Sequence, residues 1–91
     1  MLDGKTALVT GASSGIGRAT ARLLAQHGCR LAISARSTDK LKALAAELGP
    51  RTVVIVADMT RPDDVERMMA DAIAGLGQLD TLFANAGIFV T

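Results

Sequence analysis

Apolar residues follow two different rhythms along the chain, and these rhythms alternate. Short β-prone apolar runs are typical of strands, whereas apolar residues that recur every three or four positions indicate one face of a helix. The short runs predict strands at residues 6–10, 30–35, 52–57 and 81–85. The helical spacing predicts helices within residues 15–27, 41–48 and 65–76.

The helical spacing also predicts which residues face a core. The three stripes are Ile16, Ala19, Thr20, Leu23 and Leu24; then Leu41, Leu44, Ala45 and Leu48; then Val65, Met68, Met69, Ala72, Ile73 and Leu76. Residues that favour helix ends flank the stripes. They are Gly28 after the first; Ser37, Thr38 or Asp39 before the second and Gly49-Pro50 after it; and Thr60 before the third, with Gly75 and Gly77 at its end.

Strands that alternate with helices predict an α/β fold, a Rossmann-like parallel sheet with right-handed crossovers and helices on both faces. The element order is β-α-β-α-β-α-β, and the strand order 3-2-1-4 is half of a doubly wound sheet plus one strand. Residues 52–57 are continuously apolar and β-branched, which is typical of a central strand covered on both faces. In such sheets, ligands bind beyond the carboxyl ends of the strands, here after the first and fourth.

Composition narrows the class of protein. The 91 residues suffice for a single domain, and 49% hydrophobic with 21% charged residues is typical of a globular protein rather than a disordered one. A net charge of +1, no basic run and only two aromatic residues argue against nucleic-acid binding. The single His27 and Cys29 can form neither a zinc site nor an internal disulfide. With no apolar run long enough for a membrane span and no signal peptide, we expect a cytoplasmic protein.

Three glycines lie between the first strand and the first helix, in the spacing G-x-x-x-G-x-G. Gly11 lets the chain turn off the strand, Gly15 leaves room for a phosphate, and Gly17 lets the helix approach the sheet. The start of the helix then offers free N–H groups to an anion, although a tight connection alone would also explain the glycines. The predicted phosphate site comprises Gly11, Ser13, Ser14, Gly15, Ile16 and Gly17.

These residues resemble a known family. Residues 10–17, Thr-Gly-Ala-Ser-Ser-Gly-Ile-Gly, are similar to the T-G-x-x-x-G-I-G signature of the short-chain dehydrogenase/reductase family, and residues 84–87, Ala-Asn-Ala-Gly, resemble its N-N-A-G motif. Ala84 stands where the family usually has its first Asn. The resemblance covers the whole chain but only the amino-terminal part of the family's usual domain. We therefore expect residues 1–91 to be a single partial NAD(P)-binding domain.

The resemblance also implies roles for residues after the third and fourth strands. Asp58 would accept a hydrogen bond from the adenine amino group beside the Met59 backbone, although Asp58 could also cap the following helix. Asn85 would join neighbouring strand ends through side-chain hydrogen bonds, and the backbone at Ala86 and Gly87 would let the cofactor ribose pass.

The end of the second strand bears on the choice between NAD and NADP. NAD-preferring domains usually carry an acidic residue there, which holds the ribose hydroxyls. Here Ala35 takes that place and is followed by Arg36 and Ser37. Without the carboxylate, a 2′-phosphate is not repelled, and a guanidinium suits phosphate. The sequence predicts NADP as the preferred cofactor, unless Arg36 is merely a solvated side chain.

The family's acid/base Tyr, its Lys four residues later and its Ser would lie beyond this chain, which contains no Tyr. We therefore predict no catalytic residue, and we expect the 91 residues alone not to catalyse a reaction. The resemblance implies the NADP(H)-binding portion of an oxidoreductase acting on a carbonyl or secondary alcohol. The alternative is a stand-alone nucleotide-binding or interaction module without turnover. The fourth strand is expected to be an open sheet edge, which favours association.

Overall fold

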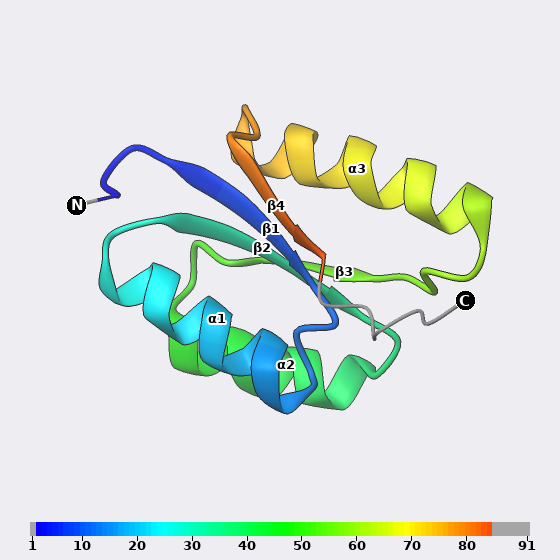
Figure 1. Ribbon diagram of the computed structural model, residues 1–91, viewed down its shortest axis with the longest axis horizontal. Coiled ribbons are helices and arrows are strands. Elements are labelled where there is room, and N and C mark those ends of the chain that lie inside the picture. Colours follow the sequence, from blue (N-terminus) through cyan, green and yellow to red (C-terminus); the bar gives the residue numbers. More distant parts are fainter. Residues whose placement is uncertain (1, 85–91) are drawn as a thin grey trace.

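The computed structural model describes residues 2–84, in which helices and strands alternate (Figure 1). The strands are β1 (Thr6–Thr10), β2 (Arg30–Ala35), β3 (Val53–Val56) and β4 (Thr81–Ala84). The helices are α1 (Gly15–Gln26), α2 (Thr38–Leu48) and α3 (Pro62–Leu76). The predicted site residues Asn85, Ala86 and Gly87 lie outside the described part of the chain.

The four strands pair in parallel in the order β3-β2-β1-β4. Val9 in the middle of β1 pairs with Ile33 of β2 on one side and with Phe83 of β4 on the other. Helices α1 and α2 cover one face of the sheet, and α3 covers the other (Figure 1). The predicted Rossmann-like fold and strand order are therefore confirmed.

Alternation along each strand divides the buried residues between two cores. Val9 and Ile33 point to the α1/α2 face, where they pack with Leu41 of α2. Leu8 points to the opposite face and packs with Met68 of α3. Both faces of β1 and β2 are thus buried, which explains why their sequences are apolar without a polar alternation.

Helix α1 buries a different face from the predicted one. Gly17 and Ala21 are buried, whereas Ile16 and Leu23 are 72% and 55% exposed. A Cβ placed on Gly17 would lie 2.2 Å from the carbonyl oxygen of Gly11. This close backbone contact turns Gly17 and Ala21 inward, so most of the apolar stripe predicted from spacing faces outward.

The prediction of a central third strand was wrong. Strand β3 lies at the edge of the sheet, and Val54 and Val56 are 37% and 40% exposed. Only its α3 face is well covered, where Ile55 is buried. A run of β-branched residues reports strand propensity, but it does not distinguish an edge from the centre. Within the described residues, β4 forms the other edge, as predicted.

Helix α3 begins one residue later than predicted. Its N-cap is Arg61 rather than Thr60, and the Arg61 side chain makes no capping hydrogen bond to the helix. Thr60 instead hydrogen-bonds to Asp58 in the turn before the helix. Pro62 occupies the first turn together with Asp63, where a fixed φ and a negative charge are favourable.

The end of α3 is held by a residue from β2. Arg30 donates from Nη1 to the carbonyl oxygen of Leu76 at 3.3 Å and from Nη2 to that of Gly75 at 3.4 Å. A cation at this position complements the partial negative charge of a helix carboxyl end. Gly75 lies inside the helix, which ends at Leu76 before the left-handed Gly77. Ile73, predicted to be buried, is 47% exposed.

Asp80 connects the start of β4 to the start of β1. Its Oδ2 accepts hydrogen bonds from the backbone N–H of Thr6 at 2.8 Å, from Thr6 Oγ1 at 3.2 Å and from Gln78 Nε2 at 3.1 Å. These bonds favour the charged carboxylate, the backbone one most of all, and they lower the pKa of Asp80.

Replacing Asp80 with Asn should therefore destabilise the fold in a pH-dependent way. A carboxylate whose pKa is lowered on folding stabilises the native state above its unfolded pKa, and this contribution is lost as pH falls through the folded value. In urea unfolding followed by circular dichroism, Asp80→Asn should lower the midpoint at pH 7, and the difference should shrink below about pH 4. Glu66→Gln, on the exposed side of α3, is the control. A pH-independent difference would contradict this account.

Candidate functional site

The loop between β1 and α1 lies at the carboxyl ends of the strands. Gly11 has a φ of +61°, which turns the chain sharply off β1. The next residue, Ala12, donates its backbone N–H to the carbonyl oxygen of Ser34 in β2 at 3.0 Å. At the neighbouring strand end, the backbone N–H of Ala57 donates to the carbonyl oxygen of Ala35 at 3.1 Å. The loops after β1, β2 and β3 are thus anchored to one another at the carboxyl ends of the strands.

The glycine loop is closed by bonds to one carbonyl group. The backbone N–H of Ser14 donates to the carbonyl oxygen of Gly11 at 3.1 Å, and the Ser14 hydroxyl donates to the same oxygen at 2.7 Å. The sequence predicted Ser14 as part of the phosphate site. In the structure, which contains no ligand, the Ser14 hydroxyl helps to close the loop by bonding to Gly11.

The first turn of α1 is open to an approaching anion. Ser14 is the N-cap, but its side chain accepts no hydrogen bond from the helix, and the first turn contains no acidic residue. Gly15 and Ile16 are exposed, and a Cβ on Gly15 would meet nothing within 4 Å. The N–H groups at a helix start lack intrahelical partners and carry a partial positive charge, which favours anion binding.

The loop after β2 adds further polar groups at the carboxyl ends of the strands. Ala35 is buried at the strand end, whereas Arg36 is exposed. Ser37 is the N-cap of α2, and its hydroxyl oxygen accepts from the backbone N–H of Lys40 at 3.5 Å. Of the three cap candidates that the sequence offered for this helix, Ser37 is therefore the one used.

Asp58 lies in the turn after β3, beside the half-buried Met59. Its Oδ1 accepts from Thr60 Oγ1 at 2.6 Å and from the backbone N–H of Thr60 at 2.9 Å. These bonds are the main reason why the pKa of Asp58 is lowered, and the positive charges of Arg36 and Arg61 lower it further. Asp58 therefore braces the turn before α3 rather than capping the helix, and Arg36 lies within electrostatic reach of it.

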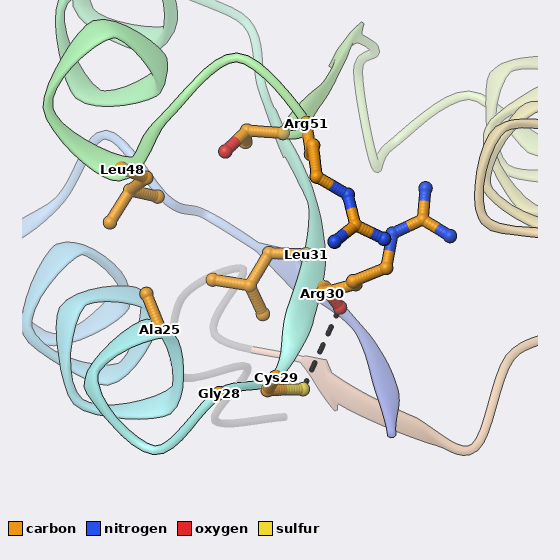
Figure 2. A pocket seen from close by; sticks show the side chains of 8 residues that line it. Ala25, Gly28, Cys29, Arg30, Leu31, Leu48 and Arg51 are labelled. Carbon is orange, nitrogen blue, oxygen red and sulfur yellow. Dashed lines mark hydrogen bonds between the residues drawn. The ribbon is translucent and has the colours of Figure 1, made fainter. Parts of the chain in front are cut away.

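The hollow drawn in Figure 2 is separate from the loops at the carboxyl ends of the strands. It has a volume of about 180 Å³ and is lined by residues that precede β2 and β3, among them Cys29 and Arg51. The thiol of Cys29 donates to the carbonyl oxygen of Arg30, and burial raises the pKa of this thiol. This hollow lies at the amino ends of the strands, opposite the predicted site.

Among residues 2–84, no three His, Cys, Asp or Glu side chains gather in a way that could hold a metal ion. None of the helices described is both long and apolar enough to cross a membrane.

A family model described as short chain dehydrogenase matches residues 5–91. The chain belongs to the short-chain dehydrogenase family. The glycine loop between β1 and α1 is the segment, residues 10–17, that resembles the family's signature. Like the resemblance, the family match covers nearly the whole chain.

Curated relatives are similar to the chain over almost its full length. It is 41% identical to a sorbitol dehydrogenase from Cereibacter sphaeroides over 97% of this chain and 34% of that protein. It is 43% identical to a glucose 1-dehydrogenase from Gluconobacter oxydans over 92% of this chain and 33% of that protein. The chain therefore spans about a third of the length of these relatives.

Solved structures agree with the fold. The chain superposes with a TM-score of 0.86 and 33% identity on a 3-ketoacyl-(acyl-carrier-protein) reductase from Brucella melitensis complexed with NADH. This match covers 90% of this chain and 34% of that one. A short-chain dehydrogenase/reductase from Caenorhabditis elegans, solved with cofactor, gives a TM-score of 0.84 at 31% identity, over 89% of this chain and 32% of that one.

Sequence reasoning missed Arg18, which contacts the glycine loop. Its Nη2 donates to the carbonyl oxygen of Ser13 at 3.0 Å. Arg18 is not part of the apolar stripe predicted for this helix, and in the structure it is half-buried. A contact of a side chain with a backbone carbonyl five residues earlier leaves no periodic signal in a sequence.

The two helix-start glycines should differ in what they contribute to stability. A Cβ at position 17 would collide with backbone atoms, so we expect Gly17→Ala to lower the free energy of unfolding by about 1–3 kcal/mol. A Cβ at position 15 meets open space, and alanine is the better helix former, so Gly15→Ala should leave the stability unchanged or raise it by up to about 1 kcal/mol. Urea unfolding of both variants tests this, and equal losses would contradict the different roles.

Proposed function

We propose that this chain is the NADP(H)-binding portion of an oxidoreductase that acts on a carbonyl or a secondary alcohol. The 91 residues would form one partial dinucleotide-binding domain. The observation that carries the proposal is the open first turn of α1, where exposed Gly15 leaves space beside uncapped N–H groups. The relatives named sorbitol dehydrogenase and glucose 1-dehydrogenase support the reaction class.

In this proposal, the diphosphate lies on the start of α1, and the two ends of the cofactor extend across the carboxyl ends of the strands. The diphosphate site comprises Gly11, Ser13, Ser14, Gly15, Ile16 and Gly17. Arg36 and Ser37 would hold the 2′-phosphate, Asp58 and Met59 would flank the adenine, and Asn85, Ala86 and Gly87 would lie along the ribose. The bound nicotinamide would supply or accept the hydride. The chain contains no tyrosine, and we assign no acid or base to its residues.

The preference for NADP rests on charge at the end of β2. Ala35 carries no carboxylate that would repel a 2′-phosphate, and Arg36 is exposed beside it. Beyond the hydrogen bonds from Thr60, the Arg36 charge also lowers the pKa of Asp58, which supports a place for the guanidinium near the turn after β3. An exposed guanidinium that gains a phosphate forms a charge-assisted contact, which contributes about 1.5–3 kcal/mol.

We also propose a cytoplasmic location. Cys29, the single cysteine, is buried just before β2, and it suits a reducing cytoplasm because no second thiol of this chain could pair with it.

Titration of the 91-residue chain with NADPH tests the diphosphate site. We expect saturable binding in isothermal titration calorimetry, weakened in Gly15→Ala because the added methyl group occupies the space that the phosphate needs. Gly15→Ala is the suitable variant because its fold should be intact. Binding that is unaffected by this substitution, or a folded chain that binds no dinucleotide, would contradict the proposal.

Replacing Arg36 with Asp should alter the choice of cofactor. The dissociation constant for NADPH should rise by about tenfold to a hundredfold relative to that for NADH, as expected for the loss of one charge-assisted contact. Arg51→Asp makes the same charge change at an exposed arginine before β3, at the opposite end of the sheet. An unchanged ratio of the two dissociation constants in Arg36→Asp, or an equal change in Arg51→Asp, would overturn the role of Arg36.

A further inference from the structure

The peptide bond between Ser13 and Ser14 is held at both of its polar atoms. Its carbonyl oxygen accepts from Nη2 of Arg18 at 3.0 Å, and its N–H donates to the carbonyl oxygen of Gly11 at 3.1 Å. These two groups lie in one plane and point in opposite directions, because the peptide bond is trans and planar. The contact with Arg18 therefore fixes the direction of the Ser14 N–H as well.

Arg18 is itself placed in a charged groove between α1 and α2. A hollow of about 180 Å³ is lined there by Arg18, Arg22, Lys40 and Glu47, among others. Arg22 forms a two-pronged ion pair with Glu47, with one contact from Nη2 to Oε1 at 2.9 Å. The hydrogen bond from Arg22, together with the charges of Arg22 and Arg18, lowers the pKa of Glu47.

The electronegative end of this peptide bond is the Ser13 carbonyl oxygen, and its hydrogen-bond donor is Arg18. The Ser13 carbonyl faces a guanidinium that lines the α1/α2 groove, whereas the exposed Gly15 lies just beyond it at the start of α1. A carbonyl oxygen facing a bound phosphate would repel it. Rotating this peptide would also break the bond between the Ser14 N–H and Gly11, which closes the loop.

We propose that Arg18 is a positioning residue for the cofactor site, which keeps the Ser13–Ser14 peptide turned away from the diphosphate, and that the negative charge of Glu47 in the same hollow favours this placement of the Arg18 guanidinium. The part of this inference that concerns affinity rests on the proposed function. Its structural part concerns the loop alone and does not require a ligand. Arg18 acts through the loop, and Glu47 acts through Arg18.

Hydrogen exchange in the cofactor-free 91-residue chain tests the structural part. The amide of Ser14 is the reporter because it donates to Gly11, and the amide of Ala12, bonded to Ser34, is the internal reference. Arg18→Met should speed exchange at Ser14 several-fold and leave Ala12 unchanged. Arg18→Lys, which keeps a donor, should restore part of the protection. Arg67→Met is the matched control, because Arg67 also donates to a backbone carbonyl, that of Val56, but on α3.

The coupling to Glu47 has its own readout. Glu47→Gln should speed Ser14 exchange less than Arg18→Met does, and it should add nothing in the Arg18→Met background if both act on the same contact. Unchanged Ser14 exchange in a folded Arg18→Met chain would overturn the inference, and additive effects of the two substitutions would remove Glu47 from it.

Cofactor titration separates positioning from direct contact. If Arg18→Met acts only by changing the direction of the Ser13–Ser14 peptide, it should weaken the binding of NADPH and of NADH by the same factor, because both contain the diphosphate. A loss confined to NADPH, or weaker binding with unchanged Ser14 exchange, would show that Arg18 touches the cofactor itself and would overturn the inference. If the wild-type chain binds neither dinucleotide, the proposed function fails, whereas the exchange result still decides how Arg18 acts on the loop.

Discussion

The contact between Gly17 and the carbonyl group of Gly11 determines the geometry of the site. No side chain fits between them, since a Cβ on Gly17 would lie 2.2 Å from that oxygen. The contact holds the first turn of α1 against the end of β1, and the same Gly11 oxygen accepts two hydrogen bonds from Ser14. One carbonyl group thus fixes the loop, the start of the helix and the helix face that is buried.

As a consequence, the candidate site at the carboxyl ends of the strands depends on backbone atoms more than on side chains. The Ser14 hydroxyl holds the loop, the Thr60 groups hold Asp58, and the Ser37 hydroxyl holds the start of α2. These three interactions each shape a turn next to a strand end. Beside these turns, Gly15 and Ile16 at the start of α1 and Arg36 after β2 are exposed. The proposed dinucleotide site rests on these exposed groups.

The sequence predicted the order of elements well because strand and helix periodicity are local properties. The bounds of β1 and β2 and the parallel order 3-2-1-4 agree with the structure. The buried face of α1 could not be predicted, because the apolar stripe through Ile16 and Leu23 is opposed by the close approach at Gly17. A tertiary contact of this kind overrides hydrophobic spacing.

The contacts that hold distant segments together were also beyond sequence reasoning. Asp80 bonds to Thr6, and Arg30 bonds to the end of α3, across separations of 74 and 46 residues. Each side chain looks like an ordinary charged residue next to a strand, and nothing in the local pattern names its partner. The glycine loop was different, because its chemistry is contained in eight consecutive residues, 10–17.

We propose that the N–H groups at the start of α1 receive the diphosphate. The change in the backbone amide resonances of the ¹⁵N-labelled chain as NADPH is added tests this proposal. We expect saturable shifts that are largest at Gly15, Ile16 and Gly17, with little change at the amino ends of the strands. Shifts centred on the hollow at Cys29 and Arg51, or none in a folded chain, would contradict it.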